Sequence, residues 1–127
     1  MAQLKVYGRR SVWAGRREDL SDVLHGALMA AWQLPEDKRF QRFVWLDDDD
    51  LVAPRGHAYL VVEVVAFAGR STQAVRALVR ETYARVCPAF GLPVDDLEIV
   101  VLESPQDRWG IRGVSGDELT LTYPVTL

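Results

Sequence analysis

The sequence has 127 residues, a net charge of −3 and 49% hydrophobic residues, which is the size and composition of one globular domain. The acidic balance argues against general binding of nucleic acids, and the longest apolar runs are too short to cross a bilayer. The first residues lack the apolar core of a signal peptide. We therefore expect a cytoplasmic protein with neither a nucleic-acid nor a membrane partner.

Residue counts limit the possible chemistry further. Cys87 is the single cysteine, so the chain can form neither an internal disulfide nor a cysteine-based metal site. We expect neither a metal nor another cofactor. Arginine outnumbers lysine by 13 to 2, which is typical of a GC-rich genome and favours a bacterial source. The four acids at 47–50 read as a solvated turn, because consecutive side chains diverge. His25 is interpreted as a packing residue, and His57 as part of a turn.

The first half of the chain predicts a strand, a helix and a second strand. Residues 4–7 alternate weakly and form a short strand candidate. A stripe with helical spacing follows, made of Leu20, Val23, Leu24, Ala27, Leu28 and Ala31. The dipeptide Leu34-Pro35 ends this helix, and the apolar residues of 40–46 then predict a strand.

The second half repeats this order. Residues 59–67 are rich in β-branched side chains and predict a central strand. The helix predicted at 71–86 has Ser71 or Thr72 as its N-cap, since either side chain accepts a bond from a free backbone N–H. Leu92-Pro93 repeats the earlier Leu-Pro junction and leads into a strand at 97–102.

The remaining residues predict a loop at 105–116 and a terminal strand. Apolar residues alternate at Leu119, Leu121, Tyr123 and Val125, as in a half-buried strand, and Pro124 favours a sheet edge. The single domain therefore divides into a first half at 1–57, a second half at 58–116 and a C-terminal strand at 117–127.

Two strand-helix-strand units predict an α+β fold, with a four-stranded sheet and both helices on one face. The uncovered face is expected to be apolar and to carry six side chains, Phe43, Trp45, Val62, Val64, Ile99 and Val101. Because such a face is not left in water, we expect a homo-oligomer.

Four segments carry a resemblance to a known family. They are residues 1–6 (Met-Ala-Gln-Leu-Lys-Val), 35–41 (Pro-Glu-Asp-Lys-Arg-Phe-Gln), 69–72 (Gly-Arg-Ser-Thr) and 108–113 (Arg-Trp-Gly-Ile-Arg-Gly). In order and spacing the chain resembles the tautomerase superfamily, and within it the branch of malonate semialdehyde decarboxylase. This resemblance implies a βαβ fold, a trimer, and chemistry at an N-terminal proline exposed by removal of methionine.

The chain departs from that pattern at the residues that carry the chemistry. Ala2 stands where the resemblance places the proline, and its amine is available only if Met1 is removed. Lys38 stands where the branch has an acid, with Asp37 beside it, and one arginine of a pair remains as Arg70. The resemblance assigns substrate binding to four residues, Lys38, Arg39, Arg70 and Trp109.

Two functions follow from this comparison of residues. The first is a superfamily member without the proline, which keeps a pocket for a small carboxylate or keto/enol acid but has weak or no tautomerase activity. The second is an active tautomerase, another isomerase or a decarboxylase-like enzyme that uses the N-terminal amine. Whether the chain is an enzyme stays open at the level of sequence.

Overall fold

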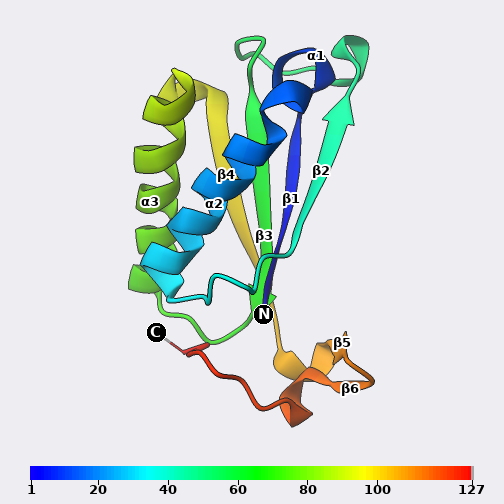
Figure 1. The fold of residues 1–127 in the computed structure, drawn as a ribbon, viewed down its shortest axis with the longest axis vertical. Helices are drawn as coiled ribbons and strands as arrows, with labels where there is room; N and C mark the ends of the chain where they lie inside the picture. Colours follow the sequence, from blue (N-terminus) through cyan, green and yellow to red (C-terminus); the bar gives the residue numbers. More distant parts are fainter. Residues whose placement is uncertain (127) are drawn as a thin grey trace.

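The computed structural model describes residues 1–126 and has the predicted α+β architecture. One sheet contains β1 (Ala2–Arg9), β2 (Gln41–Leu46), β3 (Leu60–Phe67) and β4 (Leu97–Ser104), in the order β2-β1-β3-β4. The helices α2 (Arg17–Trp32) and α3 (Thr72–Phe90) cover one face of it, and the short α1 (Arg10–Trp13) follows β1 (Figure 1). Within 1–126, no helix has the length and apolar character that a membrane span needs.

The two halves have the connections that their repeated pattern predicts. β1 pairs with β2 in parallel across α2, and β3 pairs with β4 in parallel across α3. The halves join through the antiparallel pair β1–β3, in which Leu4 lies opposite Val64 and Val6 opposite Val62. All four of these side chains are at most 2% exposed, so the core lies between this central pair and the helices.

The prediction of which apolar residues lie on the open face was wrong. Val62 and Val64 belong to the buried core, and Phe43, Trp45, Ile99 and Val101 pack against it, so all six face the helices. Their registers explain this, since side chains at alternate positions of paired strands share a face. The open face instead mixes charged side chains, such as Lys5, with the exposed apolar Val44, Val100 and Leu102.

The helix ends follow the local chemistry of the sequence. Ser71 is the N-cap of α3, and its hydroxyl accepts a bond from the Ala74 N–H at 3.1 Å. Gln33 and Gly91 end α2 and α3 in the left-handed conformation. Helix α3 runs to Phe90, beyond the predicted end at 86, with Pro88 in its last turn.

The region after β4 differs from the prediction. The expected loop contains a small hairpin, β5 (Gly110–Ile111) and β6 (Val114–Ser115), joined by Arg112 and Gly113 with φ of 50° and 86°. Positive φ at both turn residues is the geometry that joins two strands most tightly.

The C-terminal strand predicted at 117–127 was wrong within the described residues, and Leu127 lies outside them. Residues 117 and 118 belong to a 3-10 turn, and 119–126 form no strand. The alternation of apolar residues instead reflects packing across the end of the sheet, where Tyr123 contacts the core. Thr126 and Val125 lie close to Gly69, where a side chain's Cβ would be 3.1 Å from the Thr126 methyl carbon.

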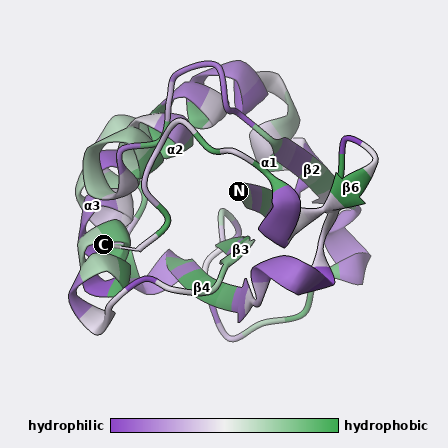
Figure 2. Ribbon diagram, turned by 90° about the horizontal axis from the view of Figure 1, so that it is seen from below, coloured by the Kyte–Doolittle hydropathy of each residue, from purple (hydrophilic) through white to green (hydrophobic). Residues whose placement is uncertain are grey.

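Several chain ends meet at the lower end of the sheet (Figure 1). They are the starts of β1 and β2, the ends of β3 and β4, the end of α2 and the start of α3. Figure 2 looks onto this end and shows the N-terminus near its centre, with the C-terminal segment passing beside it. The residues singled out in the sequence analysis gather here, with the exceptions described below.

Candidate functional site

The chain begins in a buried position. Met1 is 7% exposed, and its carbonyl accepts a hydrogen bond from the Phe67 N–H at 3.1 Å, which extends the pairing of β1 with β3. Burial, and then the positive charge of Arg70, lower the pKa of the Met1 α-amino group from its usual 8.0 to about 5. The amine is therefore neutral at pH 7 and can accept a proton.

Arg70 is a buried cation with unused donors. Its side chain is held between β3 and α3, where the residue is 7% exposed and Nη1 donates to the Phe67 carbonyl at 3.2 Å. The guanidinium lies 4.0 Å over the ring of Trp32. Its Nε and Nη2 are buried and have no hydrogen-bond partner in the described chain. A buried cation without an acceptor is costly, and both of these donors are shielded from solvent by the residues around them.

Charged neighbours partly offset the cost of burying Arg70. Burial lowers the pKa of the Arg70 guanidinium, whereas the phenol of Tyr123 and the carboxylate of Glu103 act in the opposite direction. Glu103 is placed by its own contact, because its Oε2 accepts the Gly69 N–H at 3.1 Å. Arg70 thus has a carboxylate nearby, and the side chain of Glu103 is held in place by the backbone of Gly69.

A pocket of about 220 Å³ opens beside the N-terminus. Its lining combines Met1, Lys38 and Arg112 with the C-terminal segment 119–123, and none of these residues is acidic. Arg70 does not line the pocket, but its charge lowers the pKa of the Met1 amine. It also opposes burial, which raises the pKa of the Tyr123 phenol. The charge of Arg70 thus acts to lower the pKa of two lining residues, Met1 and Tyr123, although Arg70 itself does not line the pocket.

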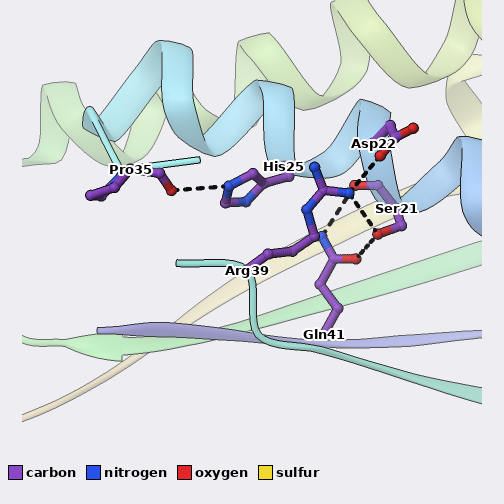
Figure 3. Close-up of polar contacts among 6 residues, drawn as sticks. All are labelled: Ser21, Asp22, His25, Pro35, Arg39 and Gln41. Carbon is purple, nitrogen blue, oxygen red and sulfur yellow. Dashed lines mark hydrogen bonds and ion pairs between the residues drawn. The ribbon is translucent and has the colours of Figure 1, made fainter. Parts of the chain in front are cut away.

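Lys38 and Arg39 are adjacent in the sequence, but their side chains have different surroundings. Lys38 lines the pocket. Arg39 instead points to α2, where Nη1 contacts Asp22 Oδ1 at 2.5 Å and donates to Ser21 Oγ at 3.2 Å (Figure 3). Arg39 is therefore committed to a contact with the helix rather than placed in the pocket beside Met1.

Two other residues from the sequence analysis lie beside the pocket rather than in its lining. Ala2 is 4% exposed within β1, and with Met1 present its nitrogen is a peptide nitrogen without basicity. Trp109 stands edge-on to Phe67, with ring centroids 5.1 Å apart, and its buried Nε1 has no partner in residues 1–126. It lines a separate open hollow along the β5–β6 hairpin.

Sequence reasoning missed three residues of this region, namely Trp32, Arg112 and Tyr123. Trp32 ends the apolar stripe of α2, and its Nε1 donates to the Ala74 carbonyl at 2.9 Å. The stripe predicts that Trp32 is a core residue, but it does not predict the stacking of Arg70 on its ring. Arg112 lies in a hairpin turn and Tyr123 in an irregular segment. Their approach to Met1 depends on the path of the chain after β4.

A second polar cluster joins Ser11, Asp48 and His57 at the other end of the sheet, but its geometry does not fit nucleophilic catalysis. Ser11 Oγ and Asp48 Oδ2 both approach the same ring nitrogen of His57, at 3.4 and 3.8 Å. A catalytic triad uses the two nitrogens separately. No group of three potential ligands among His, Cys, Asp and Glu is placed to hold a metal ion within 1–126.

Fold and site together define a class of protein, in which two βαβ units place an N-terminal amine in a cationic pocket. The family model described as tautomerase enzyme matches residues 38–112, more than half of the chain. The chain belongs to this family of tautomerases.

Solved structures show the same fold. FG41 malonate semialdehyde decarboxylase, inhibited by 3-bromopropiolate, is similar with a TM-score of 0.83 and 21% identity, covering 96% of this chain and 99% of that one. Native fused 4-OT is similar with a TM-score of 0.84 and 18% identity, covering 92% and 98%. N1, of the cis-3-chloroacrylic acid dehalogenase family, has a TM-score of 0.78 and 19% identity, covering 89% and 82%.

Proposed function

We propose that this chain binds a small carboxylate or keto/enol acid in the pocket beside Met1 and turns it over weakly or not at all. The observation that carries this proposal is the positive charge at the pocket, where Arg70 lies buried behind Met1 and its charge lowers the pKa of the Met1 amine. A carboxylate bound in the pocket would be stabilised by this charge from behind the lining. Lys38 and Arg112 add positive charge to the pocket lining. A small anion would be attracted from solvent and held by these side chains.

The weak turnover follows from the groups beside this anion. The resemblance places a proline where Ala2 stands, so an exposed Ala2 would provide a primary amine without the fixed geometry of a ring. Lys38, a cation, replaces the acid of the related branch. Groups that act as a unit lose most of their effect together, so these changes are expected to reduce catalysis steeply.

An active tautomerase is the second candidate, and one observation favours it. The α-amino group of Met1 has a pKa of about 5, so at pH 7 it is a neutral base in contact with the pocket. A neutral amine suits proton transfer in keto/enol conversion more than a decarboxylation that needs a cationic amine.

The assembly we propose is a homotrimer. Fused 4-OT, which shares this fold, has been described as a symmetric and as an asymmetric trimer. The open sheet face of this chain exposes Val44, Val100 and Leu102, each 38 to 46% accessible. Burial of these residues against neighbouring copies would favour assembly. The mass of the native particle, measured by light scattering, tests this directly.

The decisive experiment compares Arg70→Ala with the unmodified chain in two assays. One measures binding of pyruvate by calorimetry, and the other the ketonisation of an arylenolpyruvate. We expect the substitution to abolish pyruvate binding, whereas unchanged binding would contradict the proposal. Ketonisation at enzyme-like efficiency, lost in Arg70→Ala, would select the second candidate. Intact mass should accompany both assays, because it establishes whether Met1 or Ala2 carries the amine.

A further inference from the structure

A cluster of polar contacts fixes the connection between α2 and β2, and we refer to it as the junction cluster. It joins Ser21, Asp22 and His25 of α2 to Pro35, Arg39 and Gln41 (Figure 3). His25 Nε2 lies 3.1 Å from the Pro35 carbonyl, which only accepts, so this nitrogen carries the proton. Gln41 Nε2 donates to the Ser21 carbonyl at 3.2 Å.

Lys38 lies inside this set of contacts. On its N-terminal side, His25 holds the Pro35 carbonyl, and the same carbonyl accepts the Lys38 N–H at 3.1 Å. On its C-terminal side, Arg39 is held by Asp22 at 2.5 Å. The backbone around Lys38 is thus tied to α2 from both directions, although the segment belongs to no helix or strand. No ion pair to Lys38 occurs within the described residues, so its charge is available to the pocket.

The charges around the pocket are arranged at two places. Arg70 lies buried behind Met1, between β3 and α3, and acts on the pocket through its charge. Lys38 and Arg112 belong to the lining itself, on two different segments, and no acidic residue lines the pocket with them. A ligand with a single carboxylate would leave one cation of the lining without an anionic partner. The volume of about 220 Å³ is below the roughly 300–1,000 Å³ of pockets for drug-sized ligands, so the ligand is small.

We propose that Lys38 is a specificity-determining residue that binds a second anionic group of the ligand, so that the pocket selects small dicarboxylates over monocarboxylates. Arg39 is the positioning residue, which acts through Lys38 and not on the ligand. This inference rests on the proposed carboxylate site and specifies its substrate class. It also gives a role to the replacement of an acid by Lys38, since a carboxylate at this position would repel the second anionic group.

The experiment compares fumarate with fumaramate, in which one carboxylate is replaced by an amide of similar shape. Calorimetry would measure both dissociation constants for the unmodified chain and for Lys38→Met, Arg39→Ala and the double variant. We expect fumarate to bind about five- to tenfold more tightly than fumaramate, as for one charge-assisted contact. Lys38→Met should remove this preference, and Arg39→Ala should remove most of it.

Non-additivity separates positioning from a general structural effect. If Arg39 acts through Lys38, adding Arg39→Ala to Lys38→Met changes neither dissociation constant further. Arg39→Lys, which keeps the contact with Asp22, should restore most of the preference. Lys5→Met and Arg42→Ala are the matched controls, because both side chains belong to the open face of the sheet. Neither control should alter the preference for fumarate.

A second measurement needs no ligand. The chain has only two lysines, Lys5 and Lys38, so reductive methylation with ¹³C-formaldehyde gives two lysine signals that Lys5→Arg assigns. Arg39→Ala should shift and sharpen the Lys38 signal and leave that of Lys5 unchanged. An unaltered Lys38 signal would overturn the role of Arg39.

The outcomes distinguish this inference from the proposed function. Equal affinity for fumarate and fumaramate, both lost in Arg70→Ala, would keep the carboxylate site and overturn the selection of dicarboxylates. Absence of binding by either ligand to the unmodified chain would overturn the proposed function and this inference together. A preference that survives Lys38→Met would assign the second anionic group to another cation and would also overturn the inference.

Discussion

The guanidinium of Arg70 lies 4.0 Å over the ring of Trp32, at the place where the end of α2 meets the start of α3. Trp32 is itself fixed, because its Nε1 donates to the Ala74 carbonyl at 2.9 Å. An aromatic face is the partner that stabilises a buried cation without consuming its donors. This stack therefore stabilises the charge of Arg70 in its buried position.

The first prediction concerns Arg70→Met, which removes the charge and keeps a long apolar side chain over Trp32. We expect an unchanged or higher free energy of unfolding, by up to about 1 kcal/mol, because a buried cation without a carboxylate partner is costly. Affinity for pyruvate should fall at least about tenfold. The pKa of the Met1 amine should rise but stay below 8.0, since burial is the larger cause of its shift. Urea denaturation, calorimetry and amine titration by NMR check these three results.

The second prediction follows from the α-amino group of Met1, whose pKa falls from 8.0 to about 5 on folding. Between these values the unfolded chain binds a proton that the folded chain does not bind. The stability due to the neutral amine is therefore present above pH 8 and is lost as the pH falls towards 5. The difference in Tm between the free chain and an N-terminally acetylated control should change across this window. A constant difference would contradict a buried, weakly basic amine.

The third prediction concerns the residue that follows the initiator methionine. Ala2→Pro, with Met1 removed, should raise the rate of enol ketonisation, because a ring-constrained secondary amine replaces a flexible primary one. The ultraviolet absorbance of the enol would be followed to measure the rate of ketonisation, and mass spectrometry would establish that Met1 is absent. Ala2→Gly, which leaves a primary amine, is the control. No gain in the proline variant would mean that the rest of the site does not support catalysis.

The fourth prediction concerns Gly116, which is buried beneath the hairpin. A Cβ at this position would overlap the Gln106 carbonyl oxygen and lie 3.1 Å from Trp109 Cβ. Gly116→Ala should therefore reduce the free energy of unfolding by about 1–3 kcal/mol, as overpacking does. Gly110→Ala is the matched control, since no atom lies within 4 Å of its added Cβ. Equal effects of the two substitutions in urea denaturation would contradict this packing.

The elements of the fold were predictable because their signals are local. The helical spacing of Leu20, Leu24 and Leu28 reflects burial on one side of α2, and all three side chains are at most 3% exposed. The β-branched residues of 59–67 became β3, next to β1 at the centre of the sheet. Ser71 was identifiable as a cap because its hydroxyl reaches only a few residues along the chain.

The predictions that failed depended on contacts between distant residues. Strand alternation divides residues into two sets but does not say which set faces the helices, so Val62 and Val64 were placed on the wrong face. The alternation that ends at Val125 reports burial and not strand pairing, so it predicted a strand where the chain crosses the end of the sheet. Arg39 and Lys38 are adjacent in sequence, yet only Lys38 lines the pocket.

The sequence by itself determined the two βαβ units, the family resemblance and the departures at Ala2 and Lys38, because each depends only on residue type and spacing. Only the tertiary structure decided that Arg70 is stacked on Trp32 with free donors, and that Met1 carries a neutral amine. The physical reason is that desolvation and charge act through space. The environment of a charged side chain depends on which distant segments exclude water from it.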